Sequence, residues 1–365
     1  MIRKAKEEAV EEHTKGPRMT RRAQAACVLA AFVVLGRAEV ATPQALKAHQ
    51  IRQNLFSACL PTEKVGWVVG ELGRILRTED GGATWTRQNA RVKKPLLAIS
   101  CIDTQSAWIG GKSGIMLGTT DGGLMWKQLD PKTSKHIFDI AFVSRTHGVA
   151  VGDWGLMMYS EDGGVTWTLV RIPDEFVMSP LAEDIGLEPD DIILYALAFP
   201  DSSRGWVVGE FGTIMATVDG GRSWYQQRSP VETTLFGTYF ESSEQGWAVG
   251  IDAVILHTTD GGVTWRQVDA PLRQRSLYDV SLAGRYGWIA GDVGTLLKTL
   301  DGGLTWMVEP LPIELAVNWF RAVRLLPSGH GLVLGGDGLL FGIENDTVRD
   351  LSHEPPHVRN NRGPS

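Results

Sequence analysis

Short apolar runs separated by turn residues recur along most of this 365-residue chain. Within one period they cover residues 96–102, 107–110, 115–120 and 126–129, and Gly, Asp, Ser or Thr residues lie between them. Runs of this length and spacing are typical of β-strands. No segment of helical length or helical apolar spacing intervenes, so each period predicts four antiparallel strands.

Two sequence motifs mark the period. Asp-Gly-Gly triplets begin at residues 80, 121, 162, 219, 260 and 301, with separations of 41, 41, 57, 41 and 41 residues. A Gly-Trp-Val-Val-Gly type of segment occurs seven times, at residues 66–70, 107–111, 148–152, 205–209, 246–250, 287–291 and 331–335. A repeat of about 40 residues with four strands is the blade unit of a propeller. The pattern predicts an all-β fold, a seven-bladed β-propeller of four-stranded antiparallel blades whose third and fourth strands are joined by Asp-Gly-Gly turns, over residues 54–351.

The segment 78–85, Thr-Glu-Asp-Gly-Gly-Ala-Thr-Trp, falls between the third and fourth strands of its period. Glycine tolerates the positive φ of a tight turn, and an aspartate can accept hydrogen bonds from nearby backbone N–H groups. The spaced oxygen ligands of a calcium loop are absent. We therefore predict a structural turn, not a metal or catalytic site, for each of the six aspartates: Asp80, Asp121, Asp162, Asp219, Asp260 and Asp301.

The pattern Ser/Thr-x-Asp-x-Gly-x-Thr-Trp resembles the Asp-box, or BNR, repeat of sialidases and other propellers. The longer stretch 205–224 is similar to the photosystem II stability/assembly factor family, which has non-photosynthetic bacterial relatives. The resemblance covers roughly residues 54–351. It implies a non-enzymatic scaffold, without a cofactor, that binds membrane-protein subunits in assembly or support of a membrane complex. An accessory protein of an envelope transporter is an alternative.

The same resemblance implies a basic surface patch for partner binding. The candidates lie in three predicted links between blades, and they are Arg91, Lys93, Lys94, Lys132, Lys135, Arg273 and Arg275.

The N-terminus has the layout of a secretory signal. Arg21 and Arg22 precede an apolar run over 23–36, and small residues at 36 and 38 favour cleavage after Ala38. The run is shorter than the roughly 18 residues of a spanning helix, so an uncleaved anchor is the second choice. We expect a signal peptide over 1–38, with Met19 as a second candidate start, and a periplasmic or extracellular protein. A linker over 39–53 and a disordered tail over 352–365 complete the predicted organisation.

Charge and cysteine usage narrow the function classes. The net charge is −6, and removal of residues 1–38 leaves 28 basic and 38 acidic side chains, a net charge of −10. This argues against broad nucleic-acid binding, which needs a basic surface.

Cys59 and Cys101 lie in similar apolar segments and either form a disulfide or are buried thiols. No cysteine or histidine spacing resembles a zinc site. We expect a monomeric propeller.

The turns between second and third strands are predicted on the face opposite the Asp-boxes. Their carboxylates are Glu71, Asp153, Glu210, Asp252, Asp292 and Asp337. An acidic ring at a channel mouth can hold a cation or a basic peptide, whereas separate loop carboxylates are simply solvated. Both interpretations stay open.

Aromatic residues outside the repeat are the next candidates. Trp154 and Phe211 lie in second-to-third turns, and Trp319 precedes the last inner strand. Exposed aromatics on a rigid scaffold often anchor partners, although Trp319 can instead serve ring closure. The link after the third blade carries 16 extra residues, and its stretch 174–191 has seven carboxylates without Lys or Arg. Such an insertion either carries function or is a tolerated mobile loop.

A sialidase-like glycoside hydrolase is the enzymatic alternative, since Arg171, Ile172 and Pro173 are similar to a sialidase element. That chemistry needs three arginines from separate inner strands and a tyrosine–glutamate pair. The predicted inner strands carry arginine at Arg321 and Arg324, both in the last blade. We therefore predict no enzymatic activity.

Overall fold

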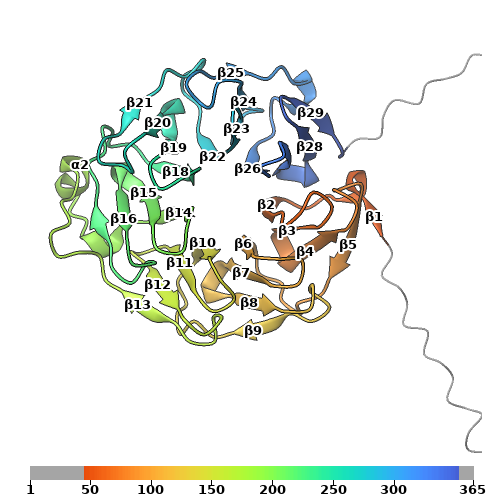
Figure 1. Ribbon diagram of the computed structural model, residues 1–365, viewed down its shortest axis with the longest axis horizontal. Helices are drawn as coiled ribbons and strands as arrows, with labels where there is room; N and C mark the ends of the chain where they lie inside the picture. Colours follow the sequence, from red (N-terminus) through yellow and green to blue (C-terminus); the bar gives the residue numbers. More distant parts are fainter. Residues whose placement is uncertain (1–44, 353–365) are drawn as a thin grey trace, which may run out of the picture. The chain divides into compact units, whose positions relative to one another are not determined.

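The computed structural model describes residues 45–352, which form seven blades around a central channel (Figure 1). In each blade, the first strand of the repeat lies at the channel and the fourth lies toward the rim. The blades comprise β2 (Leu55–Cys59), β3 (Gly66–Gly70), β4 (Arg74–Thr78) and β5 (Thr84–Gln88); β6 (Leu96–Cys101), β7 (Ala107–Gly111), β8 (Met116–Thr119) and β9 (Lys127–Leu129); β10 (Ile137–Phe142), β11 (Gly148–Gly152), β12 (Met157–Ser160) and β13 (Thr168–Val170); β14 (Leu194–Ala198), β15 (Gly205–Gly209), β16 (Ile214–Thr217) and β17 (Tyr225–Gln226); β18 (Leu235–Phe240), β19 (Gly246–Gly250), β20 (Ile255–Thr258) and β21 (Arg266–Gln267); β22 (Leu277–Ala283), β23 (Tyr286–Gly291), β24 (Leu296–Thr299) and β25 (Met307–Val308); and β26 (Phe320–Leu325), β27 (His330–Gly335), β28 (Leu340–Glu344) and β29 (Thr347–Asp350).

The prediction of an all-β, seven-bladed propeller with antiparallel blades is confirmed. The expectation of four strands in every blade is wrong for the first blade, which has five. β1 (Leu46–Lys47) pairs antiparallel with the outer edge of β5, with Leu46 opposite Trp85. An outer strand exposes unpaired backbone groups, and the segment before the first blade satisfies part of this edge.

The segment that carries β1 also takes part in ring closure. It continues as the 3₁₀ helix η1 (Ala48–Gln50), and Ala48 and Ile51 are buried with Leu332, Leu334 and Leu340 of the seventh blade. Residues 45–53, expected in a linker, thus lie on the propeller. The expected signal peptide over 1–38 and residues 353–365 of the expected tail lie outside the described residues.

The hydrophobic core is divided among the junctions between blades. Seven clusters of buried apolar side chains are each shared by two consecutive blades, and the last joins the seventh blade to the first. Every residue of β3, β7, β11, β15 and β19 is buried. Strands covered on both faces need near-continuous apolar sequence, which the Gly-Trp-Val-Val-Gly segments supply.

The Asp-boxes are turns held by side-chain hydrogen bonds. In the first, Asp80 Oδ1 accepts from Thr78 Oγ1 (2.9 Å) and Thr84 N (2.8 Å), and Oδ2 accepts from Thr84 Oγ1 (2.6 Å). Trp85 Nε1 donates to Gly82 O at 3.0 Å. Equivalent bonds lower the pKa of Asp260 to about 2, with the Thr264 hydroxyl as the largest cause. Five of the six carboxylates thus bond their own turns through both oxygens, and Asp121, whose box has Met125 in place of Thr, does so through Oδ1.

Two tryptophans of the second strands each tie an Asp-box to the preceding blade. Trp108 Nε1 donates to Gly163 O at 2.8 Å, and Trp206 Nε1 donates to Gly261 O at 3.1 Å. The seventh blade lacks an Asp-box and has a short turn at Asn345 instead. There, Trp288 Nε1 donates to Asn345 O at 3.0 Å, so the inter-blade bond survives the loss of the motif.

Cys59 and Cys101 form a disulfide between the innermost strands of the first two blades. The sequence left open whether the two cysteines form a disulfide or are buried thiols, and the structure shows the disulfide.

Candidate functional site

The second-to-third turns and the links between blades lie on one face of the ring, which we call the link face. Several of these connections are tight turns with non-helical backbone angles, and they carry the labels η2 (Glu71–Gly73), η3 (Lys112–Gly114), η5 (Glu210–Gly212), η6 (Ile251–Ala253) and η8 (Gly336–Gly338). Their backbones are fixed by two consecutive left-handed residues, as at Phe211 (φ 53°) and Gly212 (φ 69°). A Cβ on Gly212 would lie 1.9 Å from Val231 O, so this turn requires glycine there, whereas the equivalent position of η6 accommodates Ala253 (φ 58°). The turns are therefore rigid platforms.

The carboxylates of the link face do not form a continuous ring. Glu71 Oε1 accepts from Asn54 Nδ2 (2.8 Å), Glu210 Oε2 accepts from Ile193 N (3.0 Å), and Asp153 Oδ2 lies 3.1 Å from His136 Nδ1. Each of these three side chains thus holds the segment that enters the inner strand of its own blade. Asp292 is half-buried, and Asp252 and Asp337 are exposed at the left-handed position of their turns. This arrangement suits turn stabilisation better than a cation site.

Trp154 is the most prominent side chain of the link face. It occupies the left-handed position of its turn (φ 55°) and is 56% exposed. Ser113, Asp252 and Asp337 occupy the same turn position in other blades, so the turn itself does not require an aromatic side chain. A left-handed conformation is costly for a bulky residue. The indole is therefore presented to solvent at an energetic cost and without an evident packing role.

Trp319 has a different environment. Its ring stacks on Phe56 of the first blade, with centroids 6.1 Å apart, and its carbonyl accepts from Gly336 N at 3.0 Å. It is half-buried between the seventh and first blades. The structure thus gives Trp319 a role in ring closure.

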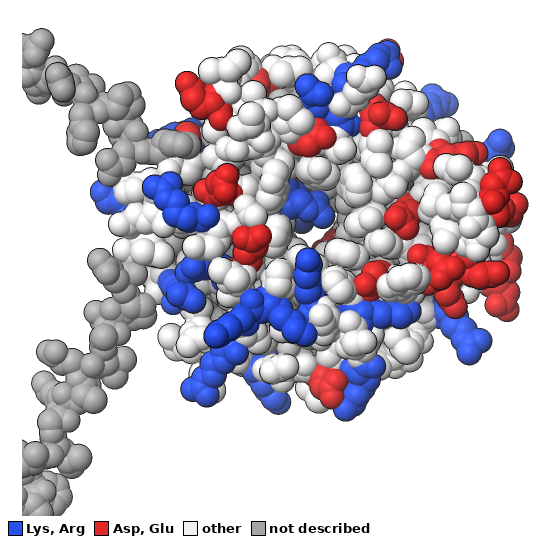
Figure 2. Space-filling model, turned by 180° about the vertical axis from the view of Figure 1, so that it is seen from behind, with Lys and Arg blue, Asp and Glu red and all other residues white. Residues whose placement is uncertain are grey.

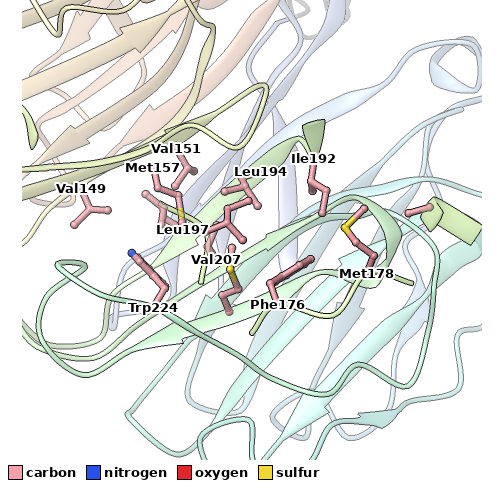
Figure 3. Packing of buried hydrophobic residues seen from close by; sticks show 13 residues of the cluster. Val149, Val151, Met157, Phe176, Met178, Ile192, Leu194, Leu197, Val207 and Trp224 are labelled. Carbon is pink, nitrogen blue, oxygen red and sulfur yellow. The ribbon is translucent and has the colours of Figure 1, made fainter. Parts of the chain in front are cut away.

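The insertion is packed between the third and fourth blades. It contains α2 (Pro180–Asp184) and the 3₁₀ turn η4 (Pro189–Asp191), and Phe176, Met178 and Ala182 are buried in the cluster shared by these blades (Figure 3). Gln226 of β17 donates to Val177 O and accepts from Val177 N, both at 2.8 Å. These contacts favour a fixed element over the alternative of a mobile loop.

A groove of about 500 Å³ lies between the insertion and the fourth blade. Apolar side chains of Phe176, Met178 and Phe211 line it together with the polar ends of Gln226 and Arg228. Phe211 is half-buried and faces this groove, in contrast to the exposed Trp154. Gly155 N of the Trp154 turn donates to Ile192 O at the end of the insertion (2.7 Å), which links the two features.

The basic candidates divide into two groups. Arg91, Lys93 and Lys94 lie in the link after the first blade, and Lys132 and Lys135 lie in the next link. Lys135 Nζ donates to Trp154 O at 2.6 Å, so this group borders the Trp154 turn.

Figure 2 shows Lys and Arg gathered over one sector of the ring and Asp and Glu over the sector that carries α2. Arg273 and Arg275 lie in the link between the fifth and sixth blades and stay separate from the first group.

The channel does not assemble sialidase-type machinery from the described residues. Arg324 is paired with Asp279, and Arg171 is exposed beyond the outer strand β13. Burial, together with the charge of Glu210, raises the pKa of Tyr195 to about 12, whereas a nucleophile needs an easily removed proton.

The described residues contain no cluster of three or more metal-ligating side chains, and among their helices none is long and apolar enough to cross a bilayer.

The sequence analysis did not identify the residues that face the channel. The sequence does contain a signal for them, because the second residue of the inner strand is aromatic in five blades. A β-bulge at that position turns the side chain toward the channel.

The fold and the six Asp-boxes define an Asp-box propeller without an assembled catalytic centre among its described residues. The chain belongs to the family described as "Photosynthesis system II assembly factor YCF48", whose model matches residues 40–132, 124–178, 175–270 and 222–318. This confirms the resemblance stated from the sequence. No curated protein matches the chain significantly.

Solved structures show the same fold. A structure described as YCF48 bound to D1 peptide is 23% identical, with a TM-score of 0.65, and covers 84% of this chain and 98% of its own. YCF48 from Cyanidioschyzon merolae is 22% identical, with a TM-score of 0.68, and covers 80% of this chain and 96% of its own. A GH74 xyloglucanase from Xanthomonas campestris is 14% identical, with a TM-score of 0.62, and covers 83% of this chain and 53% of its own.

Proposed function

We propose that this protein is a non-enzymatic, exported propeller whose link face binds a segment of a membrane-protein subunit during assembly or support of a membrane complex. The observation that carries the proposal is the exposed indole of Trp154, held on a rigid turn between a basic sector and the insertion groove. Rigid aromatic side chains beside a pocket are typical anchors of protein interfaces.

The chemistry of the link face fits an extended polypeptide. The groove offers apolar surface for one or two side chains, and Gln226, Arg228 and Ser229 on its wall offer polar groups. The link face has lysines and an arginine on one side and the acidic insertion on the other. A bound segment would therefore place its acidic part near the basic side chains and its basic part near the insertion. Membership of the YCF48 family, and the relative described as bound to D1 peptide, support this class of partner.

Capture of detergent-solubilised membrane proteins by the immobilised propeller tests the proposal. Trp154→Ala should reduce capture of an integral membrane protein about tenfold or more, because interface anchors contribute at least about 2 kcal/mol. Leu124→Ala is the matched control, since Leu124 is 84% exposed but lies in an Asp-box turn on the opposite face. Equal capture by wild type and Trp154→Ala would count against the link face.

Export is tested separately by the mass of the protein purified from its own cells. A mature chain that begins at residue 39 supports the proposed periplasmic or extracellular location. A chain that retains residues 19–38 in the cytosolic fraction contradicts it. A partner from an envelope transporter in the capture experiment would select the accessory role over an assembly role.

A further inference from the structure

Each blade has a β-bulge at the same place. The register between first and second strands shifts after the first residue of the inner strand in all seven blades. A bulge re-aims the extra side chain, and bulges are frequent next to functional sites. The bulged residues all line one cavity of about 340 Å³ in the channel, and they are Phe56, Leu97, Phe138, Tyr195, Phe236, Tyr278 and Arg321. We call these seven residues the collar.

Four of the five aromatic members of the collar, Phe138, Tyr195, Phe236 and Tyr278, contact one another in sequence. Ring centroids are 5.4 Å apart for Phe138 and Tyr195, 5.0 Å for Tyr195 and Phe236, and 5.5 Å for Phe236 and Tyr278. The last two pairs are edge-to-face, a favourable geometry for aromatic side chains. The collar is therefore a continuous apolar arc whose hydroxyls belong to Tyr195 and Tyr278.

Arg321 is the one charged member of the collar. Its guanidinium lies over the Tyr278 ring, 5.5 Å from the centroid, and Nη1 donates to Tyr278 O at 3.3 Å. Among residues 45–352, no carboxylate oxygen lies within 4.0 Å of it. A guanidinium has five N–H donors, and Arg321, which lines the cavity, uses one of its nitrogens in a hydrogen bond with Tyr278 O.

The charged residues beside the collar are occupied by the protein itself. Asp279 accepts from Arg324, Val323 N and Val280 N, and Asp139 accepts from Leu197 N and Ile140 N, both at 2.8 Å. Asp139 and Asp279 each bond the backbone of the next blade, which explains them as ties between blades. Arg321 also bonds the backbone of a neighbouring blade, through Tyr278 O, but it forms no ion pair with a carboxylate among the described residues.

We propose that the collar binds a carboxylate carried on an apolar or aromatic body, with the carboxylate on Arg321 and the body against the ring faces of Tyr195, Phe236 and Tyr278. Arginine can bind a carboxylate through two parallel N–H···O bonds, and the aromatic arc offers apolar surface to the attached body. A volume of about 340 Å³ is at the lower end of small-ligand sites, so it accepts one ring and its carboxylate. Such a group occurs in free aromatic acids and at the C-terminus of a polypeptide.

Isothermal titration with three probes tests the site and distinguishes the two sources. The probes are phenylacetate, the peptide acetyl-Ala-Ala-Phe with a free C-terminal carboxylate, and the same peptide as its C-terminal amide. Binding of either acid, without binding of the amide, supports the proposal. Binding of the peptide acid alone indicates a polypeptide C-terminus, and binding of phenylacetate alone indicates a free acid. Equal binding of acid and amide, or binding of no probe at millimolar concentration, overturns it.

Variants connect the binding to the collar. Arg321→Gln should weaken acid binding about tenfold or more, because a charge-assisted hydrogen bond is lost. Arg321→Lys should retain part of the affinity. Arg266→Gln is the matched control, since Arg266 is exposed on the outer strand β21 and should leave affinity unchanged. Undiminished acid binding in Arg321→Gln would overturn the proposal. If Arg321→Gln does not fold, a conservative Phe236→Leu variant that binds the acid as tightly as wild type would also overturn it. The rim variant Trp154→Ala should bind the acids normally, so this site and the proposed function can fail independently.

Discussion

Removal of the Cys59–Cys101 disulfide should be one of the most destabilising simple changes to the propeller. The bond joins β2 of the first blade to β6 of the second across a sequence separation of 42 residues. Closing a loop of that length in the unfolded chain reduces its entropy, and the loop-entropy relation gives about 4 kcal/mol at 25 °C. Both cysteines pack, partly buried, against the apolar cluster between these blades, so replacement by serine adds only a small packing loss.

Equilibrium urea unfolding, followed by tryptophan fluorescence, measures this effect. The Cys59→Ser/Cys101→Ser variant and the reduced wild type should both lose about 4 kcal/mol of unfolding free energy relative to the oxidised wild type. Reduction of the Cys59→Ser/Cys101→Ser variant is the matched control because that variant has no disulfide to lose, and its unfolding midpoint should not change. If reduction leaves the unfolding midpoint of the wild type unchanged, loop closure does not contribute to stability as reasoned here.

Three further changes test other parts of the structure. Asp80→Ala should lower the unfolding free energy by about 1–3 kcal/mol, because two threonine hydroxyls and one amide lose their acceptor; an unchanged melting temperature would contradict the turn role. Burial raises the pKa of Asp139 to about 6 from 3.8, so the folded state binds more protons between these values and stability falls as pH rises through them. Between pH 4 and pH 7.5, the wild type should therefore lose up to about 3 kcal/mol more unfolding free energy than Asp139→Asn. Equal losses in the two proteins, measured by urea titration at each pH, would exclude this. Ile51→Ala should cost about 2–4 kcal/mol, because Ile51 is 2% exposed between the first and seventh blades; a loss below about 0.5 kcal/mol in urea would show that the segment before the first blade does not hold the ring.

The ring itself was predictable because its determinants are local and repeated. The Asp-Gly-Gly turns and the buried second strands depend on residues adjacent in sequence, and both recur with a fixed period. The additional strand of the first blade was not predictable in this way. Leu46 and Lys47 lie outside the repeat. Their pairing partner is the outer edge of β5, at Trp85 and Thr84, which is distant in sequence.

The candidate site was predictable only in outline. The sequence placed Trp154, Phe211 and the insertion on one face, and the structure brings them together there through Gly155 N and Ile192 O. The sequence did not indicate that the side chains of Glu71 and Glu210 bond Asn54 and Ile193, the residues just before the inner strands of their own blades. The direction of these side chains depends on the left-handed geometry of the turns. The collar was missed for a related reason. A bulge shifts the alternation of side chains by one residue, so a pattern read with a period of two assigns Tyr195 to the wrong face.

Site-specific photo-crosslinking in the native cells tests the central claim most directly. A photoreactive amino acid at position 154 should crosslink to a segment of an integral membrane protein, identified by mass spectrometry of the joined peptides, whereas the same group at position 124 on the Asp-box face should not. Binding through the link face is contradicted if position 154 yields no membrane-protein crosslink, whether or not position 124 does.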